Sequence, residues 1–201
     1  MNQNRLGIAV IGAGRIGTLR ARLADKHPSV GFLAIADIDN ERARALAHQT
    51  GADYFSSDNF DVIGRPEVDA VFVSTPEGEH AAPVCRALEL GKPVLVEKPL
   101  ALDLRDAEKI LATLKATGGS LRVGYSRRYK ECFLRAKEQM LHGRLGKVVG
   151  AHARVYNSRA QAFAILKRDP HATPVLDVLT YYVDLLCWFL EGNTPVEVVA
   201  R

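Results

Sequence analysis

The stretch LGIAVIGAGRIG at residues 6–17 decides the fold of this 201-residue chain. Its apolar first half predicts a buried strand, which leads through the loop Gly12-Ala13-Gly14-Arg15-Ile16-Gly17 into a predicted helix. In such a loop the first glycine permits a tight turn, the second lets a pyrophosphate approach the backbone, and the third lets the helix pack close to the sheet. The phosphates then lie at the positive end of the helix. We therefore expect a dinucleotide-binding loop, the alternative being a purely structural turn.

Apolar runs alternate with amphipathic stretches from this loop to about residue 124. Further strands are predicted at Gly31–Ala36, Asp69–Ser74, Pro93–Glu97 and Leu121–Tyr125. Helices are predicted at Ile16–Lys26, Asn40–Thr50, Glu77–Leu90 and Asp103–Thr117. Near-continuous apolar strands alternating with helices indicate a parallel sheet covered on both faces. Residues 1–124 are thus predicted to form a doubly wound α/β domain of the Rossmann type, with its ligand at the carboxyl ends of the strands.

The pattern changes in residues 125–201, which we expect to form a second domain. Helices are predicted at Arg128–His142 and Val175–Leu190, strands at Lys147–Tyr156 and Val196–Ala200, and an irregular polar stretch at Asn157–Thr173. This order predicts a partial α+β domain.

Composition excludes several classes of protein. Hydrophobic residues make up 47% and charged residues 25%, which is typical of a globular protein, and the net charge of +4 is spread along the chain. We therefore expect no nucleic-acid partner. Asp177 and Asp184 interrupt the longest apolar stretch, which argues against a membrane span, and the apolar run near the N-terminus is too short for a secretion signal. A cytoplasmic protein follows.

The cysteines and the residues near them in the sequence do not indicate a metal site. Cys85, Cys132 and Cys187 are widely spaced, without a CxxC pair or a neighbouring ligand. Three buried thiols in a reducing compartment are expected.

Asp37 indicates which dinucleotide the loop prefers. It ends the second strand, 20 residues after Gly17. A carboxylate there accepts hydrogen bonds from the ribose hydroxyls and repels a 2′-phosphate, so NAD is favoured over NADP. The alternative role, a helix N-cap, fits Asp39 better, while Arg15 and Arg42 could still attract a phosphate.

Two further motifs follow strands and so belong at the same edge of the sheet. They are Ser74-Thr75-Pro76 and Glu97-Lys98-Pro99. Because a residue before proline is held extended, Lys98 should project from its strand end. An ammonium beside a bound nicotinamide can hydrogen-bond a substrate hydroxyl, stabilise an alkoxide or act as a base. The alternative is a solvated surface lysine.

These motifs, together with His80, Gly91-Lys92-Pro93 and the run Gly124-Tyr125 with Arg127-Arg128-Tyr129, resemble in order and spacing the glucose–fructose oxidoreductase, inositol dehydrogenase and MocA family. The resemblance implies an NAD(P)-dependent oxidoreductase acting on sugars, cyclitols and related alcohols. It implies further that residues 125–201 form part of a substrate and oligomerisation domain built on an open sheet. It also implies that Lys98 is catalytic, that Glu97 and Ser74-Thr75-Pro76 line the nicotinamide side, and that His80 lies near the cofactor. An ordinary helix-surface histidine is the alternative for His80.

The sequence departs from the family at the helix that follows the irregular stretch. The family carries an Asp there and a His four residues later, whereas this chain has Asp177 and Tyr181. Asp177, Tyr181 and Asp184 share the spacing of one helical face, which indicates either a substrate cleft or capped, solvated side chains. A phenol can act as acid/base when a cation such as Lys98 is near. Tyr181 is therefore the expected acid/base partner of Lys98, oriented by Asp177, with Arg128 and Asn157–Thr173 as substrate contacts.

Family chains are longer than this one, so we expect a chain truncated relative to the family, whose second domain exposes edge strands and an apolar face. The chain is then a fragment, a truncated gene product, or part of a homo-oligomer that covers this face. The leading hypothesis is hydride transfer between nicotinamide and a secondary alcohol of a polyol, sugar or cyclitol. The alternative is a dinucleotide-binding sensor without turnover, which Tyr181 and the short second domain suggest.

Overall fold

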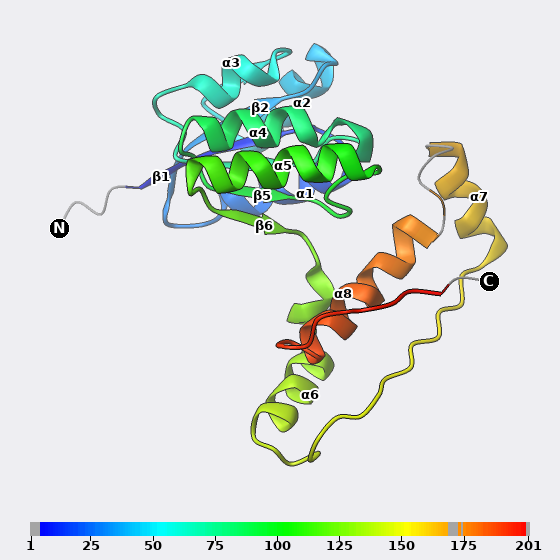
Figure 1. Cartoon of the computed structure of the whole chain (residues 1–201). Helices are drawn as coiled ribbons and strands as arrows, with labels where there is room; N and C mark the ends of the chain where they lie inside the picture. Colours follow the sequence, from blue (N-terminus) through cyan, green and yellow to red (C-terminus); the bar gives the residue numbers. More distant parts are fainter. Residues whose placement is uncertain (1–4, 169–172, 174, 200–201) are drawn as a thin grey trace. The chain divides into compact units, whose positions relative to one another are not determined.

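The computed structural model describes residues 5–168, 173 and 175–199, and its contacts divide the chain into two compact units between Gly124 and Tyr125 (Figure 1). The first unit holds a six-stranded sheet in the order β3-β2-β1-β4-β5-β6. The strands are β1 (Leu6–Ile11), β2 (Val30–Ala36), β3 (Tyr54–Ser56), β4 (Ala70–Val73), β5 (Val94–Val96) and β6 (Leu121–Val123). All neighbouring pairs are parallel, which confirms the doubly wound fold. The strand order reverses between β1 and β4, where such sheets bind ligands.

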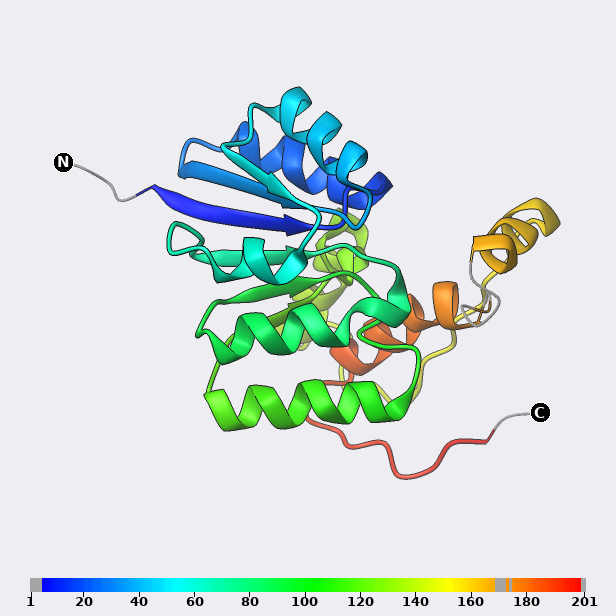
Figure 2. The ribbon, with the colours of Figure 1, turned by 90° about the horizontal axis from the view of Figure 1, so that it is seen from above.

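Five helices cover the two faces of this sheet (Figure 2). They are α1 (Arg15–Asp25), α2 (Asn40–Thr50), α3 (Asn59–Gly64), α4 (Ala81–Glu89) and α5 (Leu104–Thr117). One buried cluster joins the sheet to α1 and α2, and the other joins it to α3, α4 and α5. The central strands β1 and β2 are largely buried, and this explains why they appear in the sequence as continuous apolar runs rather than alternating ones.

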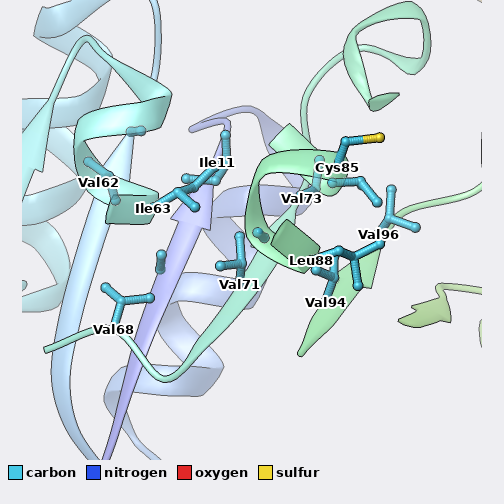
Figure 3. Close-up of a cluster of buried hydrophobic side chains, with 14 of the residues drawn as sticks. Ile11, Val62, Ile63, Val68, Val71, Val73, Cys85, Leu88, Val94 and Val96 are labelled. Atoms are coloured by element: carbon cyan, nitrogen blue, oxygen red, sulfur yellow. The ribbon is translucent and has the colours of Figure 1, made fainter. Parts of the chain in front are cut away.

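The core beneath α3 and α4 shows how the apolar runs are used (Figure 3). Val71 and Val73 of β4, together with Val96 of β5, are fully buried and meet Ile63 of α3 and Leu88 of α4. Burying one such side chain contributes roughly 1.5–3 kcal/mol. The core therefore fixes the carboxyl ends of β4 and β5, which the two sequence motifs follow.

Capping residues set the helix boundaries in the first unit. Asp39 caps α2 by accepting hydrogen bonds from the Glu41 and Arg42 amides, as its predicted N-cap role requires. Asp58 and Asp103 cap α3 and α5 in the same way. Gly51 and Gly118 end α2 and α5 with φ of 63° and 61°, a left-handed conformation that glycine adopts without strain.

Lys92, from the Gly91-Lys92-Pro93 motif, has a structural role. Its Nζ donates hydrogen bonds of 2.7 Å to the carbonyls of Ile63 and Arg65, at the end of α3. Burial lowers the pKa of the Lys92 ammonium, and the nearby Asp69 and Glu67 carboxylates oppose that shift. The side chain thus satisfies helix-end carbonyls that would otherwise lack donors.

Three small elements of the first unit differ from the prediction. β3 and α3 lie in a region for which no element was predicted. The predicted helix at Glu77–Leu90 is divided into a 3-10 turn, η1 (Glu77–Glu79), and α4.

The regular secondary structure among the described residues of the second unit is helical, and residues 148–158 and 193–199 are irregular. It contains η2 (Ser126–Tyr129), α6 (Glu131–Leu141), α7 (Arg159–Arg168), the π-helical η3 (Val175–Leu179) and α8 (Thr180–Phe189). The predicted strand at Lys147–Tyr156 is wrong, and so is the one at Val196–Ala200 over its described residues 196–199. A strand needs a hydrogen-bonded neighbour, and no strand is present among the described residues of this unit.

The irregular stretch predicted at Asn157–Thr173 instead contains α7, and its residues 169–172 lie outside the described part. The prediction of three buried thiols is also wrong, because only Cys85 is buried and Cys132 and Cys187 are exposed. Both exposed thiols belong to helices of the second unit. In the described part of the chain, every helix is too short or too polar to cross a bilayer.

Candidate dinucleotide and alcohol site

The three glycines of the loop after β1 are needed for different steric reasons. Gly12 has a φ of 98°, and a Cβ there would lie 2.6 Å from the Ser74 carbonyl oxygen. A Cβ on Gly17 would lie 1.7 Å from the Gly12 carbonyl oxygen. Gly14 differs, since a Cβ there would meet nothing within 4 Å. The space beside Gly14 is where a pyrophosphate would approach the backbone, so the loop has the shape that the sequence motif predicts.

The N-terminus of α1 is suited to bind an anion. Gly14 is the N-cap residue and supplies no side-chain cap, and the first turn contains no acidic residue. The first amides of the helix, including those of Arg15 and Ile16, have no carbonyl acceptor within the helix. Together with the helix dipole, these amides favour a phosphate at this end.

Asp37 holds the shape of the loop. One carboxylate oxygen accepts a hydrogen bond of 2.7 Å from the Ala13 amide, and the other accepts one of 2.9 Å from the Asp39 amide. The side chain is almost buried at the carboxyl end of β2. Each carboxylate oxygen has a second lone pair, so Asp37 can still accept from a ribose hydroxyl.

The Ser74-Thr75-Pro76 turn lies against the glycine loop. The Ser74 amide donates to the Ile11 carbonyl at 2.7 Å, which places this turn beside the end of β1. The Thr75 hydroxyl oxygen is buried and finds no partner among the described residues. A buried polar atom without a partner costs free energy, so a ligand group that hydrogen-bonds it would be favoured here.

The Glu97-Lys98-Pro99 turn follows β5 and is held by its neighbours. The Glu97 amide donates to the Val73 carbonyl at 2.9 Å, and the Arg20 Nε donates to the Glu97 carboxylate at 2.8 Å. Glu97, predicted to line the nicotinamide side, is thus also an ion-pair partner of α1. Arg20 was not predicted from the sequence. The signal that could have identified it is its position about one helical turn after Gly17.

His80 is buried rather than on a helix surface, so the surface alternative is wrong. It is 1% exposed. Its Nδ1 lies 2.9 Å from the Pro99 carbonyl oxygen and its Nε2 lies 3.2 Å from the Thr75 carbonyl oxygen. The ring therefore lies between the two motif turns, after β4 and after β5.

The second unit carries the other predicted site residues. Asp177 lies in the π-helical turn η3 and Tyr181 in the first turn of α8. The expected helix at Val175–Leu190 is thus not α-helical throughout, and π-helical turns often occur at functional sites. The spacing of Asp177, Tyr181 and Asp184 predicts a regular α-helix and does not indicate this wider turn.

The third polar residue of that segment, Asp184, has a protein partner. The Nε of Arg128 donates to Asp184 at 2.8 Å and its Nη2 donates at 2.5 Å. The hydrogen bonds that Arg128 donates to the Asp184 carboxylate raise the pKa of its guanidinium, and burial opposes that shift. Arg128 was predicted as a substrate contact, and the structure shows its guanidinium bound to a buried carboxylate.

Aromatic rings and a second arginine surround Tyr181. The Arg127 guanidinium lies 4.9 Å from the Tyr181 ring centroid and 4.7 Å from that of Tyr182, within the range of a cation–π interaction. Tyr125 packs edge-on against Tyr181, with centroids 6.3 Å apart. Burial raises the pKa of the Tyr125 phenol, and the Asp184 carboxylate adds to that shift. Arg127 is a neighbour of Tyr181 that sequence analysis did not predict.

The structure therefore gathers one set of predicted residues in the first unit and another in the second. The glycine loop, Asp37, the Ser74-Thr75-Pro76 turn, His80 and Glu97-Lys98 all follow strand ends of one sheet. The second set comprises Arg128, Asp177 and Tyr181. Among the described residues, no group of three His, Cys, Asp or Glu side chains could hold a metal ion.

Several known proteins resemble this chain. It is 35% identical over 191 residues to inositol 2-dehydrogenase of Gluconacetobacter diazotrophicus, an alignment covering 94% of this chain and 55% of that protein. It is also 35% identical to inositol 2-dehydrogenase of Rubrobacter xylanophilus, covering 100% of this chain and 56% of that protein. The chain thus spans about half the length of these curated relatives.

A solved structure of similar fold is myo-inositol dehydrogenase from Lactobacillus casei in complex with NAD(H) and myo-inositol. Its TM-score is 0.74 and its identity 27%, and the comparison covers 93% of this chain and 55% of that one. The Gfo/Idh/MocA family, described as oxidoreductases with an NAD-binding Rossmann fold, matches residues 6–125. Because this match runs from the first residue of β1 to just beyond β6 and covers more than half of the sequence, the chain belongs to that oxidoreductase family.

Proposed function

We propose that this chain binds NAD(H) and takes part in hydride transfer between the nicotinamide and a secondary alcohol of a cyclitol, sugar or related polyol. The observation that carries the proposal is the loop after β1, where Gly14 leaves open space beside an uncapped helix N-terminus. Two relatives that align with nearly the whole chain are named inositol 2-dehydrogenases. A cyclitol is therefore the first substrate class to test.

The residues present fit a dinucleotide. The amides of Arg15 and Ile16 would bind the pyrophosphate, and the Asp37 carboxylate would accept from the ribose hydroxyls. The buried Thr75 hydroxyl without a partner among the described residues supports a polar ligand group beside Ser74 and Pro76. When bound, the oxidised cofactor supplies a hydride acceptor. Residues 1–124 would form the dinucleotide-binding domain, and residues 125–201 part of the substrate and oligomerisation domain.

Asp37 favours NAD over NADP in this proposal. A carboxylate at the end of β2 repels a 2′-phosphate. Because two backbone amides hold the Asp37 carboxylate in place, it does not readily move away to reduce that repulsion. Arg42, a candidate for phosphate attraction, lies 3.2 Å from Asp39 in an ion pair. Calorimetry on the unmodified chain should therefore give a lower Kd for NAD than for NADP, and the reverse order would contradict this assignment.

Lys98 would act on the substrate hydroxyl. Its ammonium can donate a hydrogen bond to that oxygen and, in its neutral form, accept the hydroxyl proton as the carbon–hydrogen bond breaks. We assign Tyr181 as an acid/base group and Asp177 as its orienting carboxylate, with Asp177 and Arg128 as substrate contacts. A cytoplasmic homo-oligomer is proposed as the working form.

The test measures binding and turnover separately. NAD binding is followed by calorimetry, and NADH formation is followed by absorbance with myo-inositol, scyllo-inositol and a panel of open-chain polyols and sugars. We expect NAD binding and NADH formation with at least one cyclitol. Tight NAD binding with no turnover on any alcohol would favour a non-catalytic sensor, and absence of NAD binding would reject both functions.

A further inference from the structure

We propose that Arg20 and His80 are positioning residues that hold the Glu97-Lys98-Pro99 turn from its two sides. The inference rests on the proposed function, because the purpose of the arrangement is to fix the backbone that carries Lys98. It also goes beyond the expected cofactor contacts of Glu97 and His80.

Arg20 holds the residue before Lys98. Its Nε and Nη2 both donate to the same oxygen of the Glu97 carboxylate, at 2.8 and 2.5 Å. The Arg20 and Glu97 side chains are only 25% and 16% exposed, so water screens this pair less than a surface pair. The other Glu97 oxygen lies close to Gly124, where a Cβ would be 2.8 Å from it. Glu97 is therefore enclosed between α1 and the end of β6.

His80 holds the residue after Lys98. Its ring is almost fully buried and lies between the Pro99 and Thr75 carbonyl oxygens. Both of these partners are acceptors, so a ring nitrogen that carries a proton donates to one of them. Nothing about core packing requires an imidazole here, because an apolar side chain would fill the same space without needing partners. A neutral imidazole carries one N–H, so the ring donates to one of these carbonyls and packs against the other. The ring thereby contacts both the turn after β5 and the turn after β4.

The two contacts connect Lys98 to the proposed dinucleotide site. Arg20 belongs to α1, the helix whose N-terminus would bind the pyrophosphate, and His80 contacts Thr75, which lies beside the glycine loop. A lysine side chain is long and flexible, so the position of its backbone limits where Nζ can reach. A displacement of about 1 Å in a catalytic group can cost about 10²-fold in rate. Fixing both neighbours of Lys98 removes that freedom.

The first test is a double-mutant cycle on the Arg20–Glu97 pair. We expect Arg20→Met and Glu97→Gln each to lower kcat by roughly 10- to 100-fold, while the NAD Kd changes by less than about threefold. The double variant should be no worse than either single variant, because each removes the same interaction. Arg20→Lys should keep more activity than Arg20→Met. The control is Arg22→Met on the same helix, an exposed residue bonded to Gln49, which should leave kcat unchanged.

For His80 the matched pair of variants is His80→Gln and His80→Leu. The glutamine amide can still donate to one carbonyl, as the imidazole N–H does, although from a different position, whereas leucine donates to neither. We expect kcat to follow the order wild type, His80→Gln, His80→Leu, with KM for the alcohol changing much less. Equal kcat values in all three proteins, or additive losses in the Arg20–Glu97 cycle, would overturn the proposal.

Hydrogen exchange distinguishes this inference from the proposed function. Exchange at the Leu100 and Ala101 amides, just after the turn, should be faster in Arg20→Met and His80→Leu than in the unmodified chain, and unchanged in Arg22→Met. This readout needs no turnover. If no alcohol is oxidised by the unmodified chain but exchange changes as expected, the function fails and the positioning contacts stand. If exchange is unchanged, the positioning proposal fails whatever the activity.

Discussion

Lys98 is the residue on which turnover should depend most directly. Lys98→Met keeps the aliphatic length of the side chain and removes the ammonium, so the substrate hydroxyl loses its donor and proton acceptor. We expect NADH formation to be abolished while the NAD Kd stays within about tenfold, because the glycine loop and Asp37 carry the main dinucleotide contacts. Stopped-flow absorbance and calorimetry measure the two quantities. Activity above a few per cent of the unmodified chain would make Lys98 a surface lysine.

Tyr181 provides a second prediction at the scale of one residue. Tyr181→Phe removes only the hydroxyl and keeps the ring that contacts Arg127 and Tyr125. If the phenol acts as acid/base, kcat should fall by about 10²–10⁴ with little change in KM for the alcohol. The matched control is Tyr182→Phe, which removes the hydroxyl of Tyr182 and keeps the ring that contacts Arg127. A fully active Tyr181→Phe would restrict Tyr181 to packing and favour a mechanism with Lys98 alone.

At the scale of elements, Gly14 at the N-cap of α1 and Gly17 in the first turn of that helix provide a matched pair of variants. Gly17→Ala places a methyl group 1.7 Å from the Gly12 carbonyl oxygen, so the loop must distort and the free energy of unfolding should fall by several kcal/mol. Gly14→Ala meets no protein atom within 4 Å. We expect the Gly14→Ala chain to fold normally but to bind NAD at least tenfold more weakly. Denaturant unfolding and calorimetry test this, and normal NAD affinity in Gly14→Ala would contradict the assigned phosphate position.

Most elements of the first unit could be predicted because the central strands are largely buried and so appear in the sequence as apolar runs. β1 and α2 match their predicted bounds, since five of six β1 residues are buried and Asp39 caps α2. β3 and α3 escaped prediction because they are short, and no residue of β3 is fully buried. A short, partly exposed segment has too little hydrophobic pattern to be distinguished from a loop.

The second unit was harder to predict because its pattern depends on distant partners. Alternation at residues 147–156 predicts a strand only if another strand lies beside it, and Val149 there is 95% exposed. The same dependence on distant partners explains which contacts of the candidate site could not be predicted. The loop glycines form a contiguous motif, and Asp37 follows at the spacing typical of a dinucleotide-binding loop, so both could be recognised from the sequence. The contacts of His80 and Arg20 join residues 19 and 77 positions apart without such a motif.

At the scale of the whole molecule, the two units should respond differently to NAD. The one tryptophan, Trp188, lies in α8 of the second unit, whereas the proposed dinucleotide contacts lie in the first. NAD at 100 times its Kd stabilises the unit that binds it by about 2.7 kcal/mol. Thermal unfolding followed by circular dichroism should therefore show a transition that NAD moves to higher temperature. Trp188 fluorescence should report a transition that moves less, and equal shifts would mean that the units unfold as one.

The two hydrogen bonds of Asp37 have a consequence for how cofactor preference could change in evolution or by engineering. The carboxylate that would discriminate against a phosphate also accepts from the Ala13 amide of the glycine loop. A replacement without an acceptor, such as alanine, would relax the preference and at the same moment free a loop amide, so selectivity and loop order would be lost together. Asparagine or serine keeps an acceptor while removing the charge. Mutational paths from NAD to NADP in this protein should therefore pass through those polar residues first, and paths through apolar ones should need a stabilising substitution elsewhere beforehand.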